Sequence, residues 1–331
     1  MKKSTLIFLL LAVAAGAALW YYEFKREKKP EVSATDAKPA FTFQEEDVTG
    51  IVITRAGEKA PEVIAFEKRG KDWWMTRPLD SAVNSSNVDS IVFRSSSARI
   101  SKTIPAQAEK LAGFGLASPR LTLELKLKDG KSHRVRFGEK DFTGSDVYAL
   151  LDDKKDVDVL NGELLSTVDK PVLEFRDRRI AQIQEDDMVR LRVKNKNQAL
   201  LAEKNEAGKW IVREPASDKG KELISSRVFL TLTNGEAEEI LDQPAAAQRA
   251  RLAKPEIEID LTGKDGKVYR FSSVPDDQDK EKALFKSSAT AVLYKIRKTT
   301  HDAMNFKLAD VVQEPAKEEP APAKTPPAKP N

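Results

Sequence analysis

Few residues in this sequence are suited to acid–base or nucleophilic chemistry. There are two histidines, His133 and His301, and no cysteine. The lack of cysteine excludes disulfides, thiolate metal sites and a cysteine nucleophile. His301 precedes Asp302, but a catalytic dyad also needs a nucleophile within hydrogen-bond distance, and no Gly-x-Ser-x-Gly turn supplies one. We expect these two residues to form a polar surface pair near a helix start, and His133 to be exposed to solvent.

Two acidic segments could offer carboxylates to a cation or to a hydrolytic reaction. DDKKDVD spans residues 152–158 and PDDQDKEKA spans residues 275–283. Neither has the ligand spacing of a calcium loop, and the sequence contains no phosphate-binding glycine loop. We expect both segments to be solvated turns. The sequence therefore predicts no metal site, no cofactor and no enzymatic activity.

Tryptophans are the other side chains that could contact a ligand or a partner. Trp73 and Trp210 occupy matching places in two similar segments, and a strand tryptophan of this kind usually fills a core. Trp73 and Trp74 are neighbours, so on a strand their rings point to opposite faces and one of them approaches the surface. The candidate partner-contact residues are therefore Trp73, Trp74 and Trp210.

The elements that would position these residues come from an internal repeat. LASPRLTLELKLKDGK at residues 116–131 returns as LAKPEIEIDLTGKDGK at residues 252–267, with eight of sixteen positions identical. Apolar and polar residues alternate in both segments, which predicts a strand with one buried face. The Asp-Gly pairs that follow accept positive φ and predict hairpins.

The repeat continues on both sides of this pair of segments. EKRGKDWWMTRP matches EKNEAGKWIVREP, and the helical pair Val88 and Val92 matches Ile224 and Val228. Each copy is predicted to run strand–strand–helix–strand–hairpin–strand–strand–helix. Short turns between strands imply mainly antiparallel sheets with short covering helices, an α+β fold. The expected domains are residues 41–180 and a second, diverged copy at 181–312. The second copy lacks counterparts of Gly115 and Gly138, so its loops must run differently.

The two ends of the chain differ from the repeat in composition. The net charge of +4 belongs to residues 1–30, which hold six Lys or Arg and two Asp or Glu, so no basic domain remains to bind nucleic acid. Leu6–Tyr22 is an uncharged run long enough for a short membrane span, with an aromatic cluster before basic residues. We expect a retained anchor; the alternative is a signal peptide cut after Ala17. Residues 313–331, rich in Pro, Ala, Lys and Glu, are expected to form a disordered tail.

The order of these motifs resembles a known family. GFGLASPRLTLELKLKDGKSHRVRFGEKDFTGSDVYALLDDKKDVDVL, followed by VLEFRDRRI, is similar to the bacterial domain-of-unknown-function family 4340. The resemblance implies a short N-terminal anchor before this module and a role beside ABC-type export machinery of the gliding-motility type. No catalytic or binding residue is established for the family, so the resemblance assigns none.

Together these features predict a membrane-anchored, extracytoplasmic accessory or scaffold protein that is not an enzyme. Its expected partners are the cytoplasmic membrane, through one helix, and a protein of an ABC-type transport complex. The alternative is an envelope hydrolase or carbohydrate-binding protein that uses the loop carboxylates, whose separation in space a sequence does not give.

Overall fold

The structure of this protein, a computed structural model, describes residue 21, residues 37–105 and residues 108–313. The chain divides into two compact units, Met1–Arg176 and Asp177–Asn331. The sequence repeat places the boundary a few residues later, between residues 180 and 181. Each unit has its own sheet and its own hydrophobic core.

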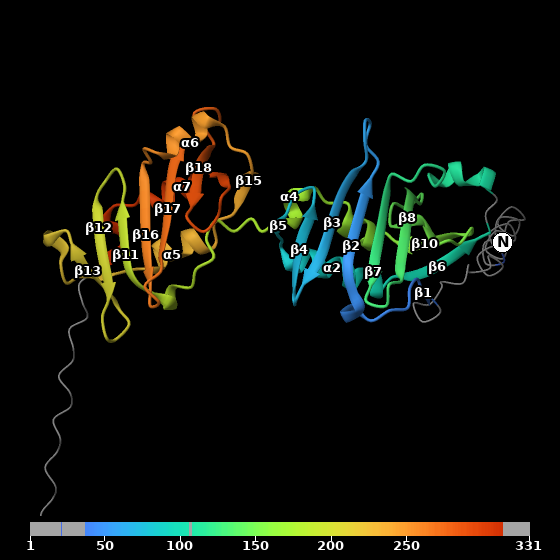
Figure 1. Ribbon diagram of the computed structural model, residues 1–331, viewed down its shortest axis with the longest axis horizontal. Helices are drawn as coiled ribbons and strands as arrows, with labels where there is room; N and C mark the ends of the chain where they lie inside the picture. Colours follow the sequence, from blue (N-terminus) through green and yellow to red (C-terminus); the bar gives the residue numbers. More distant parts are fainter. Residues whose placement is uncertain (1–20, 22–36, 106–107, 314–331) are drawn as a thin grey trace, which may run out of the picture. The chain divides into compact units, whose positions relative to one another are not determined.

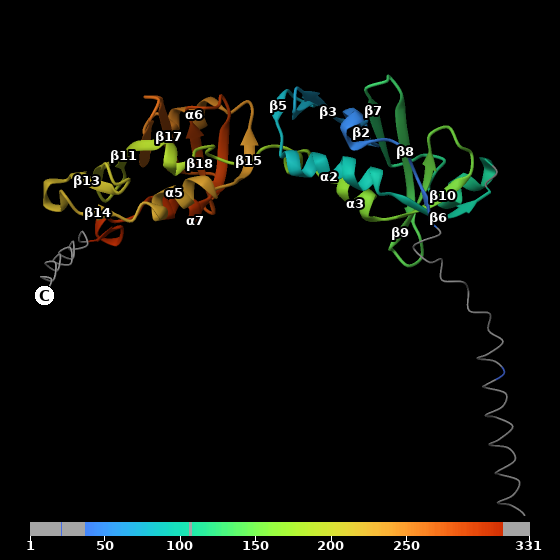
Figure 2. The ribbon, with the colours of Figure 1, turned by 90° about the horizontal axis from the view of Figure 1, so that it is seen from below.

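The first unit is built on an antiparallel sheet in the order β1-β6-β10-β9-β8-β7-β2-β3-β4-β5. Its strands are β1 (Lys38–Pro39), β2 (Val48–Arg55), β3 (Glu62–Arg69), β4 (Asp72–Arg77), β5 (Ser81–Ala82), β6 (Arg99–Ile104), β7 (Leu121–Leu127), β8 (Ser132–Lys140), β9 (Asp146–Leu151) and β10 (Val157–Asn161). Its helices are η1 (Glu45–Asp47), α2 (Ser85–Ser96), η2 (Ala108–Phe114), α3 (Glu163–Val168) and α4 (Val172–Phe175). Helices α2 and α3 lie against one face of this sheet (Figures 1 and 2).

The second unit has an antiparallel sheet in the order β15-β19-β18-β17-β16-β11-β12-β13-β14-β20. Its strands are β11 (Met188–Lys194), β12 (Ala199–Lys204), β13 (Trp210–Glu214), β14 (Glu222–Leu223), β15 (Ala237–Leu241), β16 (Ile257–Gly263), β17 (Val268–Pro275), β18 (Lys282–Ser287), β19 (Leu293–Arg297) and β20 (Val312–Gln313). Its helices are η3 (Glu185–Asp187), η4 (Ala216–Asp218), α5 (Ser226–Thr233), α6 (Ala246–Leu252), α7 (Lys298–Met304) and η5 (Leu308–Asp310). Helices α5 and α7 cover one face of this sheet, and α6 lies on the other face (Figure 2).

The two sheets place their strands in the same order. The run from β6 through β10, β9, β8, β7, β2, β3 and β4 to β5 corresponds to the run from β15 through β19, β18, β17, β16, β11, β12 and β13 to β14. Alternate residues of the matching strands β7 and β16 are buried, as one buried sheet face requires. The fold is therefore α+β, with two antiparallel sheets and a few short helices, as the sequence predicts.

The predicted hairpins are confirmed. β7 pairs with β8 and β16 pairs with β17, and both are antiparallel. The turns contain Gly130 at φ +81° and Gly266 at φ +79°, the left-handed conformation that glycine adopts at little cost. The Asp-Gly pairs of the repeat thus fix where each strand reverses.

The segment before the first helix holds more strands than the sequence predicts. Two strands are expected there, but the structure has β2, β3 and β4 and then the short β5. The chain turns between β3 and β4 at Gly70, which has φ +71°. A glycine in this conformation lets one strand end and the next begin, so EKRGKDWWMTRP spans a hairpin between β3 and β4.

Helices α2 and α5 also correspond to each other, but the residue-by-residue pairing differs from the one predicted from the sequence. The N–H of Asn84 donates to Phe175 O at 2.9 Å, and the N–H of Ile224 makes the matching bond to Val311 O at 2.7 Å. Ile224 therefore corresponds to Asn84 and precedes α5, whereas the sequence comparison pairs it with Val88. The buried residue of α5 that corresponds to Val88 is Val228. Extra residues between β13 and β14 shift the register by about one helical turn.

Within the part of the chain that the structure describes, no helix is long and apolar enough to cross a membrane. Apart from Tyr21, the predicted span Leu6–Tyr22 lies outside the described residues. Apart from residue 313, the predicted tail does so as well.

Candidate functional site

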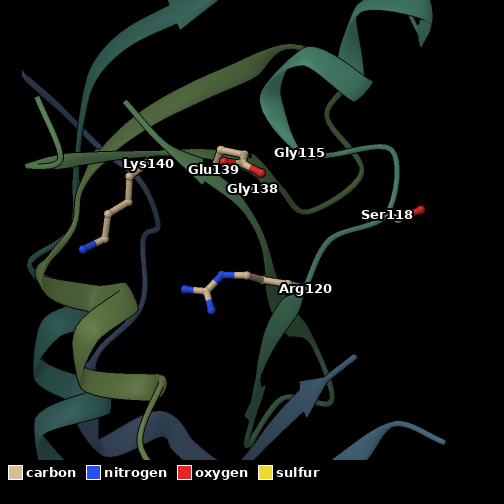
Figure 3. A pocket seen from close by; sticks show the side chains of 6 residues that line it. All are labelled: Gly115, Ser118, Arg120, Gly138, Glu139 and Lys140. Atoms are coloured by element: carbon tan, nitrogen blue, oxygen red, sulfur yellow. The ribbon is translucent and has the colours of Figure 1, made fainter. Parts of the chain in front are cut away.

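A surface pocket of about 400 Å³ lies in the first unit, where the chain after η2 and before β7 meets the end of β8 (Figure 3). The pocket is lined by Gly115, Ser118, Arg120, Gly138, Glu139 and Lys140. Along β8 the pairing with β9 shifts between Phe137 and Lys140. This bulge takes two residues out of the regular ladder and re-aims the side chains beside them.

Two glycines let the segment after η2 approach β8 closely. Gly115 has φ +68°, and a Cβ atom there would lie 2.6 Å from Glu139 Cγ. A Cβ atom on Gly138 would lie 2.1 Å from the carbonyl oxygen of Phe114, so any side chain there would displace the segment. Close backbone packing therefore fixes this wall of the pocket.

The charged side chains of the pocket lie on different sides of it. Arg120 and Lys140 extend toward the same open space, whereas the carboxylate of Glu139 lies beside Gly115 and Gly138 (Figure 3). Arg120 Nη2 lies 2.9 Å from Asp169 Oδ2. The side chain of Arg120 is still 56% exposed, so this ion pair leaves much of the guanidinium accessible. The pocket thus offers two cations and one carboxylate to a ligand.

In the second unit an arginine of the chain itself occupies the corresponding region. Arg251 stands where the sequence repeat has Gly115, one residue before the shared Leu-Ala pair. Its guanidinium donates to the carbonyl oxygen of Pro275 at 2.5 Å and lies 3.0 Å from the carboxylate of Asp277. Pro275 pairs with Ala283 as Lys140 pairs with Val147 in the first unit. The two units therefore differ in the region that lines the pocket of the first one.

Trp73 and Trp210 lie in the two cores. Each is 3% exposed, which leaves neither ring a surface to offer a partner. The indole N–H of Trp73 donates to Asp89 at 2.8 Å, and that of Trp210 donates to Glu185 at 3.0 Å. Burial with a hydrogen-bonded N–H is the usual arrangement of a structural tryptophan.

Trp74 is the partly exposed member of the three candidate contact residues. The guanidinium of Arg69 lies over its ring, 5.1 Å from the centroid, and also pairs with Asp80 at 2.5 Å. The hydrogen bond from Arg69 holds the pKa of the Asp80 carboxyl below its usual range, whereas the indole N–H of Trp74 has no hydrogen-bond partner among the described residues. Trp74 therefore sits in a polar cluster of the surface, beside β5 at one edge of the sheet.

The expectation that His301 and Asp302 form a surface pair is wrong. His301 is 2% exposed on the inner side of α7. Its Nδ1 lies 2.8 Å from Ser273 Oγ, and its Nε2 lies 3.6 Å from Glu256 Oε2. Burial lowers the pKa of His301, against the opposing effect of the Glu256 and Asp302 charges. The imidazole and hydroxyl resemble part of a catalytic triad, but Ser273 is 1% exposed and also bonds Leu284 O.

His133 is likewise less exposed than predicted. Its side chain is 21% exposed, and its ring packs against those of Phe41 and Phe43, with centroids 5.1 and 5.8 Å away. Nδ1 of His133 lies 3.2 Å from Asp152 Oδ2. The aromatic pair that partly covers it comes from before β2, and the sequence repeat gives no sign of this contact.

The acidic segments are turns that run into strands, and their carboxylates are not all solvated. Asp158 lies on β10, is 2% exposed and accepts a hydrogen bond from the Thr103 hydroxyl at 2.6 Å, so the expectation of a solvated turn is wrong for it. Asp152 accepts a hydrogen bond from the N–H of Arg134 at 2.8 Å. Asp276 is buried and lies 3.3 Å from Lys295 Nζ, so the expectation of a solvated side chain is wrong for this residue. A buried carboxylate of this kind needs a cation to offset its lost hydration. Among residues 37–105 and 108–313, no three or more His, Cys, Asp or Glu side chains are grouped to hold a metal ion.

The sequence prediction missed Arg120 and Lys140. A signal was present, because Gly115 and Gly138 have no counterparts in the second copy and Arg120 is matched there by Glu256. The bulge that brings Lys140 to the pocket was also missed. Its sign in the sequence is the break in alternation after Val135 and Phe137, where Gly138 is followed by the charged Glu139 at the next inward position.

Comparisons with known proteins give few relatives. No curated protein matches the chain. A solved structure described as an inhibitor of motility from Bacillus subtilis matches at 9% identity over 77% of this chain and 92% of that chain. Its TM-score is 0.15, so the match supports no conclusion about the fold.

The comparison with family models agrees with the resemblance seen in the sequence. The model of a family described as Domain of unknown function (DUF4340) matches residues 73–255. The match begins at Trp73 in β4, ends at Pro255 just before β16, and covers more than half of the chain. This chain therefore belongs to the DUF4340 family.

Proposed function

We propose that this protein is a non-catalytic binding scaffold of the cell envelope. Its N-terminal residues would hold it in the cytoplasmic membrane, with both units on the extracytoplasmic side. The uncharged run Leu6–Tyr22 and the basic residues that flank it support the tether. In this proposal the two sheets serve as rigid supports for contact surfaces.

The difference between the two units is the observation that carries a binding role. They share a strand order, but the first unit has a pocket lined by Arg120 and Lys140, whereas in the second unit Arg251 stands in place of Gly115 and bonds to Pro275 O. A rigid sheet that holds charged side chains around a preformed pocket is suited to binding. The second unit would then serve mainly as a structural extension of the first.

The proposed protein partner is an ABC-type transport complex. This part of the proposal rests on the resemblance of the chain to its family. The complex should be recovered when the full-length protein, tagged at its C-terminus, is purified from its host in a mild detergent. Co-purification of both a membrane-spanning subunit and an ATP-binding subunit, in amounts comparable to the protein, is the expected result. Repeated recovery of the protein without these two subunits would contradict the partner assignment.

Sidedness has its own test. A reporter that is active only outside the cytoplasm, fused after residue 331, is expected to be active. Activity of the matching cytoplasmic reporter would reverse the proposed topology, because the chain is expected to cross the bilayer once.

The hydrolase alternative has no observation in its favour. Asp152 and Asp153 belong to the first unit, whereas Asp276 and Asp277 belong to the second. Asp276 and Asp277 pair with Lys295 and Arg251 within their own unit. Asp153→Ala alters an exposed carboxylate and should leave function unchanged; loss of function in a folded protein would revive the alternative.

A further inference from the structure

We propose that the pocket of the first unit binds a small ligand through an oxyanion, a carboxylate or a phosphate, held between Arg120 and Lys140. This proposal names a ligand class for the binding role proposed above. It rests on that proposed function only because both treat the pocket as a binding site. The transporter partner could be absent and the pocket would still bind its ligand, so the two proposals are tested separately.

Arg120 can bind an anion in addition to its own ion pair. Its partner Asp169 also lies 3.3 Å from Arg55 Nε, and Arg55 pairs with Glu62 as well, so this cluster is balanced and the anion would be bound by the exposed part of the Arg120 guanidinium. Arg120 contacts Asp169 through Nη2 and has other N–H groups to donate. A planar guanidinium with free donors is the side chain best fitted to bind a carboxylate or phosphate.

Lys140 supplies the second cation. Its side chain extends toward the same space as that of Arg120 (Figure 3). Among the residues that the structure describes, Lys140 has no acidic side chain within ion-pair distance. An anion placed between Lys140 and Arg120 would therefore gain two favourable charge interactions.

Glu139 narrows the class of ligand. Its carboxylate lies beside Gly115 and Gly138, on the other side of the view from Arg120, and can accept hydrogen bonds from hydroxyl or ammonium groups (Figure 3). A volume of about 400 Å³ exceeds what a bare ion fills and falls within the range of small-molecule sites. The ligand expected here is a small polar molecule, with the oxyanion at one end and hydroxyl or ammonium donors at the other.

The second unit lacks the two cations of the pocket, so one anion-binding site per chain is expected. Glu256 immediately precedes β16 as Arg120 immediately precedes β7, so the charge at this position is reversed. Pro275 takes the place of Lys140 in the strand pairing, and the guanidinium of Arg251 is bound to its carbonyl oxygen. The second unit therefore has neither of the two cations at these positions. Its own pocket beside this segment, of about 340 Å³, is lined by a different set of residues that includes Leu252, Pro255 and Arg270.

Isothermal titration calorimetry on the full-length protein in detergent tests the proposal. The probes are inorganic phosphate, acetate, glycine and glucose 6-phosphate, each at low ionic strength because salt weakens such contacts. Saturable binding of at least one probe, with one site per chain, is expected. Binding of phosphate and glucose 6-phosphate alone would identify a phosphate group, and binding of acetate or glycine would identify a carboxylate. No saturable heat with any probe would overturn the proposal.

Three variants separate the pocket from the rest of the surface. Lys140→Ala removes one cation and should weaken binding about tenfold, the effect of one favourable charge contact. Ser118→Trp keeps both cations but fills the exposed rim, and it should abolish binding of the larger probe first. Lys102→Ala removes an exposed lysine of β6 that does not line the pocket, so the affinity should not change. Equal affinities for wild type, Lys140→Ala and Ser118→Trp would place the anion elsewhere and contradict the proposal.

Discussion

His301 and Ser273 form a polar pair at positions where the first unit has apolar side chains. Ser273 pairs with Ile257 and Phe285, as Phe137 pairs with Leu121 and Ala149. The buried residues His301 and Met304 of α7 match the buried residues Leu165 and Val168 of α3. The second core therefore contains one titratable group that the first core does without.

Burial of this imidazole predicts a pH dependence of stability. The pKa of His301 is lowered in the folded state from the ordinary imidazole value of 6.5. As the pH falls below 6.5, the unfolded chain therefore takes up a proton on His301 more readily than the folded protein does. The stability is fully present above about pH 6.5 and declines as the pH falls through the folded-state pKa. His301→Leu, which copies Leu165, should flatten this decline when urea midpoints are measured between about pH 5 and pH 8. An unchanged pH profile in the variant would show that other groups cause the decline.

Among the elements, the bulge of β8 does most to position the pocket. Its effect depends on Gly138, where the carbonyl of Phe114 leaves no room for a side chain. The sequence predicts that the second copy must differ at this point, since it lacks Gly115 and Gly138. The sequence does not show how the second copy differs there. Arg251 replaces the glycine, but its hydrogen bond to Pro275 O depends on how the two segments pack in space.

Gly138→Ala should destabilise the first unit by about 1–3 kcal/mol, the usual cost of forcing an extra methyl group into close packing. The segment before β7 should become more open to proteolysis in this variant. Gly113→Ala is the matched control, since a Cβ atom there has nothing within 4 Å. Urea unfolding of the two variants gives the free energy of unfolding of each. Equal stability of the two variants would mean that the segment does not pack on β8 as described.

Patterns within one element could be predicted from the sequence, and contacts between elements could not. Alternation in residues 121–127 and the Asp-Gly turns gave the hairpins correctly, because strand period and turn chemistry are local. The expectation for His301 failed because a helix as short as α7 has little periodicity, and its buried side depends on how it docks. The helix offset failed because residues inserted before β14 shift the pairing without changing the helical pattern.

At the scale of the whole molecule, each unit has one large hydrophobic core and one smaller cluster among the described residues. The buried cluster of the first unit draws on residues 40–175 and that of the second on residues 180–311. Ile53 on β2 and Val193 on β11 occupy equivalent places, and both are fully buried. The duplication therefore provides a matched pair of sites at which the two cores can be weakened one at a time.

Ile53→Ala should cost about 2–5 kcal/mol, since it leaves a cavity in the first core. Amide hydrogen exchange should accelerate more in strands of the first unit than in those of the second. Val193→Ala is the reciprocal variant and should have the opposite pattern. Equal acceleration in both units from either variant would contradict the assignment of each core to one unit.

The most direct test of the account is a crystal structure of the protein grown or soaked with the oxyanion probe that binds it in solution. The account predicts the anion between Arg120 and Lys140 in the first unit, with the Arg251 guanidinium on Pro275 O in the second. An anion bound beside Arg251 instead, with Arg120 and Lys140 free of it, would contradict the central claim that the first unit holds the binding site.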